Sequence, residues 1–434
     1  MSEISRSEYR AAALLGAIVL VVTATTVFWL ANSGALLAGD GASILIALGR
    51  LAGLALMLLM LAQLLLASRA PFLDLFDRFI PLRTHRIIGF SILAVLALHI
   101  AFLIAGYALG SGISWTAQFV SFISSWEDVG KALVGAVIIL LVGALSAQAV
   151  RRHVRYETWY LFHLSLYAAI LLSVGHQLAS GDMATGAARL LWLALIGGSV
   201  AVFFAYRVMR PLWFFYRCRF RVARVVRETP STVSVYVTGR HLDEFRFDAG
   251  QYAHVTFFQR GLASHHPFSF SKPYDGSEIR FTMRAFGDFT NSASDLRVGT
   301  RVLIDGPMGH LTRRSAVTGR YCFIAGGVGI TPIAALVLAL PDPQAAIVLV
   351  SNRTREDAPL LGEIRGTGVT LYEYFSADSA PTRINGDEIL RTCPDVHTRD
   401  VYLCGPSGML DALSHTLIAR GVPRAQIHSE PFAY

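Results

Sequence analysis

Long apolar runs separated by short polar connections dominate the chain up to about residue 210. A helix needs about 20 apolar residues to cross the hydrocarbon core of a membrane. Six runs reach this length, and we expect one spanning helix in each, at residues 11–32, 43–67, 83–107, 131–149, 157–177 and 188–206. The pattern therefore predicts a six-helix transmembrane bundle formed by residues 1–212.

After residue 212 the chain changes to short runs rich in β-branched and aromatic residues, with turn residues between them. Four runs, at 220–227, 233–238, 252–258 and 279–285, predict a small antiparallel β-barrel within residues 213–316. Residues 317–434 alternate buried strands, at 321–325, 346–351, 369–374 and 400–404, with helices at 331–340 and 407–420. This alternation predicts an α/β domain with a doubly wound parallel sheet.

The connections between the apolar runs differ in positive charge. Arginines gather between runs two and three, between runs four and five, and after run six: Arg69, Arg78, Arg83, Arg86, Arg151, Arg152, Arg155, Arg207 and Arg210. The connections 33–41, 109–130 and 179–186 contain no Lys or Arg, although Lys131 and Arg189 lie close by. Because positively charged loops favour the cytoplasm, we expect both termini there and the bundle in the cell (inner) membrane.

Composition narrows the classes of function. The chain of 434 residues is 53% hydrophobic, which is too apolar for an ordinary soluble protein. Its net charge of +8 is not gathered in a basic run, so we expect no nucleic-acid partner. The four cysteines all follow residue 212 and form no C-x-x-C pattern. This argues against a structural zinc site and against a covalently attached haem.

Two of the predicted spans carry two histidines each. His85 and His99 are fourteen residues apart on the third span, and His163 and His176 are thirteen apart on the fifth. At a rise of about 1.5 Å per residue, the members of each pair are roughly 20 Å apart along their helix. Neutral imidazole is a common metal ligand, and ionisable residues inside a membrane are functional candidates. The pattern predicts two stacked b-type haems, one at His85/His163 and one at His99/His176.

The angular positions of these histidines differ between the two spans. At about 100° per residue, His99 lies roughly 40° from His85, so one helix face carries both. On a regular helix His176 would lie roughly 140° from His163, so we expect a bulge in the fifth span or an irregular end near Gly175. A single membrane histidine is more often interfacial or hydrogen-bonded to a neighbouring helix. The matched two-by-two pattern favours the haem interpretation.

Arg50 lies inside the second predicted span, at the level of His99 and His176 in this topology. A charged side chain in a membrane is costly without a partner. A haem propionate, or an anion that forms beside the haem at His99/His176, would supply that partner. The alternative is that Arg50 extends its charge to the membrane edge.

Two motifs follow strands of the predicted barrel. HPFSFS places the hydroxyl of Ser269 next to the ring of Phe268, which suits a flat heteroaromatic ligand. In the second motif, Arg284, Gly287 and Thr290 can bind a phosphate, because glycine lets the phosphate approach the backbone. Either motif alone is also typical of an ordinary turn.

Three further signals follow strands of the parallel sheet. AGGVGITP closes a strand and opens a helix, whose N-terminus favours a pyrophosphate. Arg353 follows the next strand and suits a 2′-phosphate, which favours NADPH over NADH; a surface arginine is the alternative. The sequence CGP at Cys404 ends the last strand, at the sheet edge where ligands bind. The terminal aromatics Phe432 and Tyr434 could cover a flat cofactor or could simply pack.

In this order and combination, the motifs resemble the NADPH oxidase and ferric reductase superfamily from the second span to the last residue. The histidine spacings are similar to that family's haem ligands, and Arg50 to its second-span arginine near the outer haem. HPFSFS and RAFGDFT are similar to its flavin-binding segments, although serine stands at 269 where threonine is commoner. AGGVGITP and CGP resemble the nicotinamide-binding pair of ferredoxin–NADP reductases. The resemblance implies a ferric reductase-like bundle followed by a ferredoxin–NADP reductase-type module that binds FAD.

The resemblance also implies roles for individual residues. It assigns cofactor contacts to His266, Pro267, Phe268, Ser269, Ser271, Arg284, Gly287, Thr290, Gly326, Gly327, Gly329, Thr331, Arg353, Gly405 and Pro406. It places Cys404 near the nicotinamide, and Phe432, or its rival Tyr434, over the flavin. No calcium-loop or proline-rich pattern is present, so we expect no required protein subunit.

Three hypotheses follow. In the first, the protein is a transmembrane NADPH oxidase that moves electrons from cytoplasmic NADPH through FAD and two haems to molecular oxygen, and so forms superoxide. In the second, the path is the same and the acceptor is a ferric chelate. In the third, it is a haem-binding electron-transfer or sensing protein with a degenerate reductase half. The intact HPFS, GGVG and CGP sequences argue against the third hypothesis.

Overall fold

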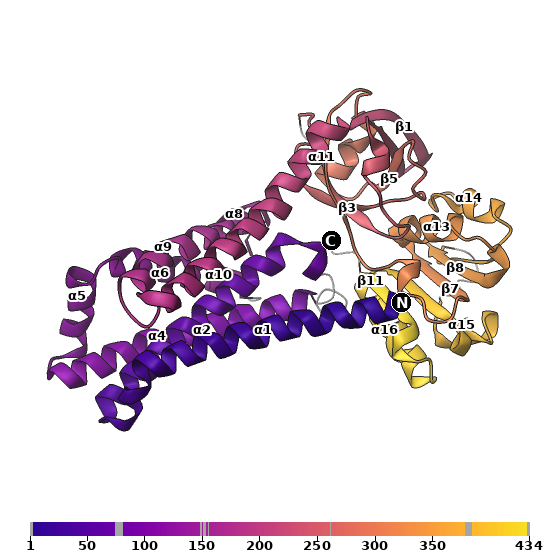
Figure 1. Ribbon diagram of the computed structural model, residues 1–434. Helices are drawn as coiled ribbons and strands as arrows, with labels where there is room; N and C mark the ends of the chain where they lie inside the picture. The colour runs from indigo at the N-terminus through magenta and orange to yellow at the C-terminus, as the bar shows by residue number, and fades with distance from the viewer. Residues whose placement is uncertain are drawn as a thin grey trace. The chain divides into compact units, whose positions relative to one another are not determined.

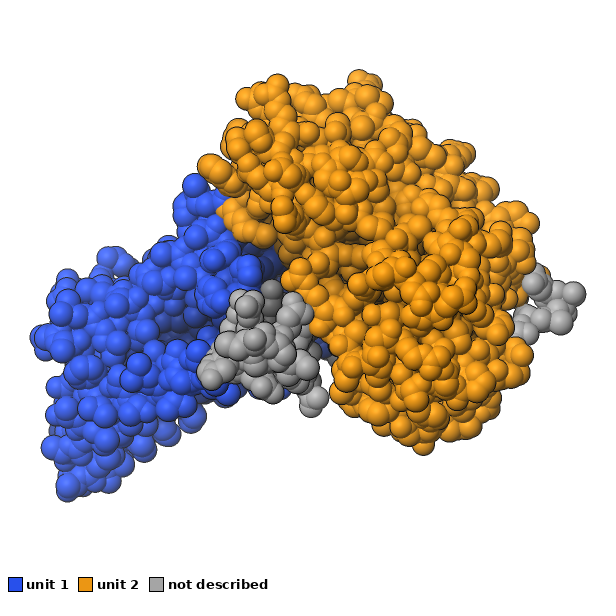
Figure 2. Space-filling model, turned by 45° about the vertical axis from the view of Figure 1, so that its right-hand side comes forward, with its two compact units in different colours: residues 1–209 blue, residues 210–434 orange. Residues whose placement is uncertain are grey.

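The computed structural model describes residues 3–73, 81–147, 150, 153–154, 156–260, 262–377 and 384–431. Some residues named above lie outside these ranges: Arg78, Arg151, Arg152, Arg155, Phe432 and Tyr434. The chain forms two compact units, residues 1–209 and 210–434 (Figure 1 and Figure 2). The boundary expected after residue 212 falls within the first helix of the second unit, α11 (Arg210–Cys218).

Helices make up the first unit (Figure 1). They are α1 (Glu3–Ser33), α2 (Gly41–Ser68), α4 (Pro81–Ser111), α5 (Trp115–Ser125), α6 (Val129–Ser146), α8 (Tyr156–Leu164), α9 (Leu166–Ala179) and α10 (Gly186–Phe204). Within the described residues, six helical stretches are long and apolar enough to span a membrane, as the hydrophobic pattern predicts. Apolar side chains also cover the outside of the unit; Leu20 is 68% exposed and Leu190 is 70% exposed. This exterior suits lipid, and the protein is an integral membrane protein.

Helix α2 supplies much of the buried interior of this unit. Its side chains Met57, Met60 and Leu61 are almost fully buried against residues of α4, α6, α9 and α10, such as Trp192. The indole N–H of Trp29 on α1 donates to the backbone carbonyl of Ala47, at 3.1 Å. This packing holds α2, α4, α6, α9 and α10 together in one bundle.

Two features of the bundle depart from the sequence pattern. Helix α5 lies in the connection 109–130, where no helix was predicted. The fifth span is interrupted at Ser165, whose N–H bonds to the carbonyl of Phe162, three residues back, at 3.1 Å. This tighter turn overwinds the helix and so reduces the roughly 140° offset between His163 and His176. The expectation of an irregular end near Gly175 is wrong, because α9 runs through that residue.

The second unit begins with α11 and an antiparallel barrel. One sheet has the order β1 (Arg221–Thr229), β2 (Thr232–Thr238), β5 (Ile279–Arg284), and the other has the order β4 (His266–Ser269), β3 (Tyr252–Phe257), β6 (Val302–Met308). Single bridges, Phe270 to Phe281 and Arg221 to Arg301, join the two sheets at both edges and close the barrel. The barrel is confirmed, but β4 and β6 were not predicted. The HPFS sequence itself forms β4.

A parallel sheet with the order β11-β10-β7-β8-β9 completes the unit. Its strands are β7 (Tyr321–Gly326), β8 (Ala346–Asn352), β9 (Thr370–Phe375), β10 (Asp400–Gly405) and β11 (Ile427–Pro431). Helices α13 (Ile330–Leu338) and α14 (Leu361–Gly366) pack on one face, and α15 (Gly386–Thr392) and α16 (Ser407–Ala419) on the other. The doubly wound α/β fold is confirmed; β11 was not predicted. The strand order reverses between β7 and β10, so ligands are expected at the carboxyl ends of these two strands.

Asp400, at the start of β10, links the sheet to the segment that precedes β7. Its fully buried carboxylate accepts hydrogen bonds from the N–H groups of Val317 and Thr318, from the Thr318 hydroxyl and from His428, at 2.7–3.0 Å. Burial alone would raise the pKa of Asp400, but these hydrogen bonds lower it below its ordinary value. The ionised carboxylate therefore stabilises the folded state.

We expect Asp400→Asn to lower the free energy of unfolding at pH 7 by about 2 kcal/mol, because hydrogen bonds to a charged group each contribute roughly 1.5–3 kcal/mol. The folded-state pKa lies below the unfolded value of about 3.9, so this stabilisation is present above that pH and is lost as the pH falls through the folded-state pKa. Thermal unfolding of the full chain in detergent measures the effect. Asp411→Asn, at an exposed position, is the control. A difference from wild type that grows on acidification would contradict the account.

Candidate functional site

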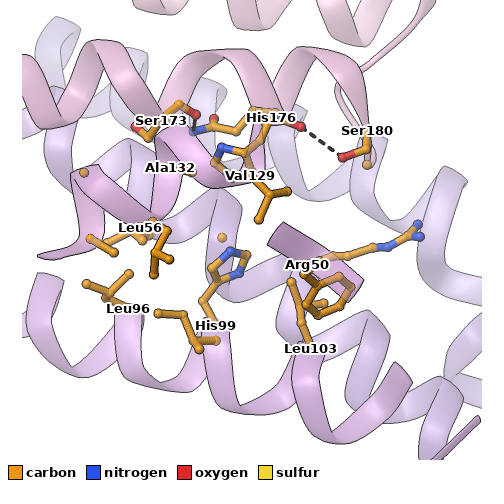
Figure 3. Close-up of a pocket in the computed structure, with 18 of the residues that line it drawn as sticks. Arg50, Leu56, Leu96, His99, Leu103, Val129, Ala132, Ser173, His176 and Ser180 are labelled. Carbon is orange, nitrogen blue, oxygen red and sulfur yellow. Dashed lines mark hydrogen bonds between the residues drawn. The ribbon is translucent and has the colours of Figure 1, made fainter. Parts of the chain in front are cut away.

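Two cavities lie inside the first unit, and each is lined by two of the four predicted histidine ligands. The first, here named the Arg50 cavity, has a volume of about 210 Å³ and is lined by Arg50, His99 and His176 (Figure 3). The second, the His85 cavity, has a volume of about 390 Å³ and is lined by His85 and His163. The structure thus brings the histidines together in the pairs that their spacing predicts.

His85 on α4 and His163 on α8 face each other across the His85 cavity. Their ring centres are 5.9 Å apart and their ring planes are inclined by 50°. A metal ion between the two rings would make two ligand bonds of roughly 2 Å each. These two bonds, together with the distance from each nitrogen to its ring centre, add up to about the observed separation of the ring centres. Trp159 packs beside His163 with a ring-centre distance of 4.9 Å. The pair therefore fits a single metal ion held between two imidazoles.

His99 and His176 project toward each other from α4 and α9 in the Arg50 cavity (Figure 3). Nδ1 of His99 lies 2.8 Å from the carbonyl oxygen of Gly49, which orients the ring and leaves its other nitrogen for a ligand. A Cβ atom on Gly53 would lie 2.6 Å from the His99 ring, so only glycine admits the ring at this position.

Buried imidazole nitrogens give a second test of the fit to haem. Nδ1 of His163 and Nδ1 of His176 are buried with no hydrogen-bond partner among the described residues. Such atoms are costly in an apolar interior unless something binds them or their ring. No group of three or more His, Cys, Asp or Glu in the described ranges could hold a metal ion, but a haem needs only two protein ligands. Each pair supplies the two imidazoles that a bis-histidine haem needs.

Arg50 is held at the edge of its cavity by side chains from three other segments. Its guanidinium donates to the Tyr107 hydroxyl at 3.1 Å and to Ser33 Oγ at 3.3 Å, and it lies 3.7 Å from Asp182 Oδ1. Arg50 thus has partners inside the protein, while its side chain is 30% exposed. Sequence reasoning missed Asp182, because the connection that carries it has no periodic pattern.

The Arg50 cavity has aromatic walls on the side of α5. Tyr107 on α4 forms edge-to-face contacts with Phe122 on α5 and with Trp126, at ring-centre distances of 5.4 and 5.3 Å. All three side chains line the cavity. The walls are apolar apart from a few groups, among them Arg50 and Asp182, so the cavity suits a small, weakly polar molecule beside the histidine pair.

In the second unit, the flavin-motif residues occupy neighbouring strands of the barrel. Phe268 and Ser269 lie on β4, with Ser269 almost buried, and the Phe268 ring stacks near Phe289 at 5.9 Å. His266 packs on the same Phe289 ring at 4.2 Å, and Pro267 between them is exposed. Strand β4 thus gathers the aromatic part of the motif.

Ser271 does not share this surface. It is fully buried, and its hydroxyl is engaged with the Arg280 carbonyl, the Arg280 Nε–H and the Thr282 hydroxyl. Arg280 in turn pairs with Glu363 on α14 at 2.6 Å. Ser271 therefore stabilises the junction between barrel and sheet, and its position does not support the predicted cofactor contact.

The predicted phosphate-binding residues lie at the end of β5. Thr290 Oγ1 accepts from the N–H of Phe286 at 2.7 Å, which shapes the turn that contains Gly287. Arg284 is paired with Asp357, which follows β8. The Asp357 carboxylate occupies the arginine in this structure, and an incoming phosphate would compete with it.

The glycine turn and the CGP sequence meet at the carboxyl edge of the parallel sheet. The turn Gly327–Gly329 follows β7, and a Cβ atom on Gly329 would lie 2.1 Å from the carbonyl oxygen of Cys404. The Thr331 hydroxyl donates to the carbonyl of Val328 at 3.0 Å and closes the turn. These contacts bring Gly326, Gly327 and Gly329 together with Gly405 and Pro406 at the reversal of strand order.

Cys404 and Arg353 lie at this edge in different environments. Cys404 is buried, and burial raises the pKa of its thiol, which is therefore neutral at pH 7. Arg353 follows β8 with an exposed side chain. The predicted contact of Phe432 lies outside the described residues.

The comparisons with known proteins agree with this division of the chain. Residues 52–174 match the family model described as the ferric reductase like transmembrane component, the hallmark of the NADPH oxidase and ferric reductase superfamily. This match covers α4 and α6, most of α2 and the first part of α9, and so includes His85, His99 and His163 but ends before His176.

Curated relatives match a further part of the chain. The reductase component of propane 2-monooxygenase from Rhodococcus jostii (strain RHA1) is 27% identical over 235 residues, 49% of this chain and 63% of that protein. Phenoxybenzoate dioxygenase subunit beta from Ectopseudomonas oleovorans is 33% identical over 141 residues, 32% of this chain and 42% of that protein. NADH oxidoreductase HCR from Escherichia coli (strain K12) is 29% identical over 218 residues, 48% of this chain and 66% of that protein. The chain thus spans only part of the length of these relatives.

We expect Gly329→Ala to raise the KM for the nicotinamide nucleotide at least tenfold, because the added Cβ would collide with the backbone at Cys404 and displace the turn. NADPH-dependent ferricyanide reduction by the full chain measures this without involving the first unit. Gly362→Ala on α14 is the matched control, since nothing lies within 4 Å of its Cβ position. An unchanged KM in Gly329→Ala would show that the turn does not bind the nucleotide.

Proposed function

We propose that this protein, whose residues 52–174 match the ferric reductase like transmembrane component, is a transmembrane NADPH oxidase. In this proposal NADPH and FAD bind to the second unit on the cytoplasmic side. Electrons then cross the membrane through two b-type haems and reduce molecular oxygen to superoxide. The partners are the acceptor and the lipid bilayer of the cell (inner) membrane. Both termini lie in the cytoplasm. No nucleic acid or protein subunit takes part.

The observation that carries the proposal is the arrangement of four histidines as two facing pairs in two cavities of one bundle. His85 and His163 would hold the first haem, and His99 and His176 the second. Haem supplies one-electron transfer, and the residues around it fix its position and tune its potential. The hydrogen bond from His99 to Gly49 is the kind of contact that orients such a ligand.

The second unit supports the supply of electrons. Phe268 and Ser269 would contact the flavin ring, and Arg284 with Thr290 its phosphates, once Arg284 leaves Asp357. The turn Gly327–Gly329 and the segment Cys404–Pro406 would hold the nicotinamide nucleotide, since backbone N–H groups there favour phosphate. With its buried neutral thiol, Cys404 would exclude water beside the nicotinamide.

The choice of acceptor rests on the Arg50 cavity. His99 and His176 would hold a haem there, and that haem would supply one-electron transfer to oxygen. The positive charge of Arg50 would stabilise the anion that forms. The aromatic wall of Tyr107, Phe122 and Trp126 favours a small acceptor. A ferric chelate, which the name of the matching family model suggests, is the second candidate.

The test uses the purified full chain in detergent with FAD and NADPH in air. NADPH oxidation and cytochrome c reduction are followed together, with and without superoxide dismutase. Loss of the cytochrome c signal with dismutase, while NADPH oxidation continues, is the expected result. A signal that persists without oxygen consumption would exclude the oxidase and leave ferric chelates as the acceptors to test.

The preference for NADPH rests on Arg353 at the end of β8, although the matching Escherichia coli protein is by name an NADH oxidoreductase. We expect Arg353→Ala to raise the KM for NADPH roughly tenfold or more and to leave the KM for NADH unchanged, because hydrogen bonds to a charged phosphate contribute about 1.5–3 kcal/mol. Arg420→Ala, at an exposed arginine of the same domain paired with Asp387, is the control. Equal effects on both nucleotides would refute the role of Arg353.

A further inference from the structure

We infer that Asp182 is a positioning residue for the acceptor step. Asp182 fixes the guanidinium of Arg50 at one end of the Arg50 cavity. The negative charge of Asp182 compensates the positive charge of Arg50 until an anion forms in the cavity. This inference rests on the proposed function, in which Arg50 stabilises the reduced acceptor. Asp182 belongs to the connection between α9 and α10, which no sequence motif marks.

Asp182 is buried inside the first unit, beside Arg50. The side chain is only 1% exposed, and it lines the Arg50 cavity. Oδ1 accepts from Ser33 Oγ at 2.6 Å and lies 3.7 Å from Arg50, whereas Oδ2 is buried without a partner among the described residues. A buried carboxylate with one unsatisfied oxygen is costly unless a nearby positive charge compensates it. Arg50 is in position to do so.

The backbone around Asp182 is also held in place. The side-chain amide of Asn32, at the end of α1, donates to the Asp182 carbonyl at 2.9 Å. Ser33, the next residue, bonds to both Asp182 and Arg50. The connection between α9 and α10 is therefore fixed to α1. Through Asp182, this connection determines the position of the Arg50 guanidinium.

The position of the guanidinium follows from these contacts. Figure 3 shows the Arg50 side chain extending away from His99 toward the end of the cavity. Tyr107 holds the other terminal nitrogen at 3.1 Å, and Tyr107 also belongs to the aromatic wall. Asp182 and Tyr107 together keep the charge beside the space for the acceptor, rather than over the His99 ring. Without Asp182, Arg50 loses its one ionic contact in the described structure and keeps only its hydrogen bonds to Ser33 and Tyr107.

The experiment compares wild type, Asp182→Asn, Arg50→Ala and the double variant as full-length, haem-loaded protein. Each is reduced by NADPH without oxygen and then mixed with oxygenated buffer, and the haem absorbance reports both rates. We expect Asp182→Asn to slow reoxidation about tenfold, with a higher KM for oxygen, and to leave the anaerobic reduction rate unchanged.

The double variant should be no slower than Arg50→Ala, because Asp182 acts through Arg50. Asp182→Glu should recover part of the rate. Asp40→Asn, which keeps an N-cap residue on α2, is the matched control.

Reoxidation of Asp182→Asn at the wild-type rate would overturn the inference, and so would additive losses in the double variant.

Thermal unfolding of the same four proteins tests the pairing without any acceptor. Each single variant should unfold at a lower temperature, and the double variant should lose less than the sum of the two; additive losses would refute the pairing. If wild type reduces a ferric chelate but not oxygen, the oxidase proposal fails. The same comparison with the chelate as acceptor then decides the role of Asp182.

Discussion

The structure of the first unit depends on how ionisable side chains are accommodated inside an apolar helical bundle. Four imidazoles and one arginine lie among leucines, methionines and aromatic rings, where an unsatisfied polar atom is costly. The protein gives each of these groups a defined neighbour. His85 faces His163, His99 faces His176 and bonds to Gly49, and Arg50 is held by Ser33, Tyr107 and Asp182. The buried Nδ1 atoms of His163 and His176 are the exceptions, because they have no hydrogen-bond partner among the described residues.

The second unit meets a different constraint, because its ligands must reach backbone groups at the surface of a sheet. Reversal of strand order between β7 and β10 leaves the carboxyl ends of these strands open. The close approach of Gly329 to Cys404 then places two glycine-containing turns side by side. Two ion pairs connect the barrel to this sheet: the buried Arg280 with the exposed Glu363, and Arg284 with Asp357. Contacts across the junction thus couple the flavin-motif strands to the nucleotide turn.

Much of this architecture could be predicted from the sequence. Spans follow from apolar length. The histidine pairs follow from spacing, because separations of fourteen and thirteen residues on two parallel helices place the rings at similar depths. Strands β4 and β6 were harder to predict, since β4 has four residues with Pro267 inside it and β6 contains Gly306 and Pro307. The pairing of Arg50 with Asp182 could not be predicted, because the two residues are far apart in sequence and meet only through the packing of α1, α2 and a connection. The sequence motif likewise could not predict that Ser271 is buried inside a polar network. The mismatch in helical angle predicted an irregularity in the fifth span, but it did not predict that the irregularity lies at Ser165.

We propose that each of the two cavities holds one haem between its two histidines. The most direct measurement is the haem content of the purified full chain by the pyridine haemochrome absorbance, set against protein concentration, for wild type, His163→Ala and His176→Ala. The account predicts two non-covalent haems per wild-type chain and about one in each variant. A wild-type chain without haem, or variants that keep the wild-type content, would contradict it.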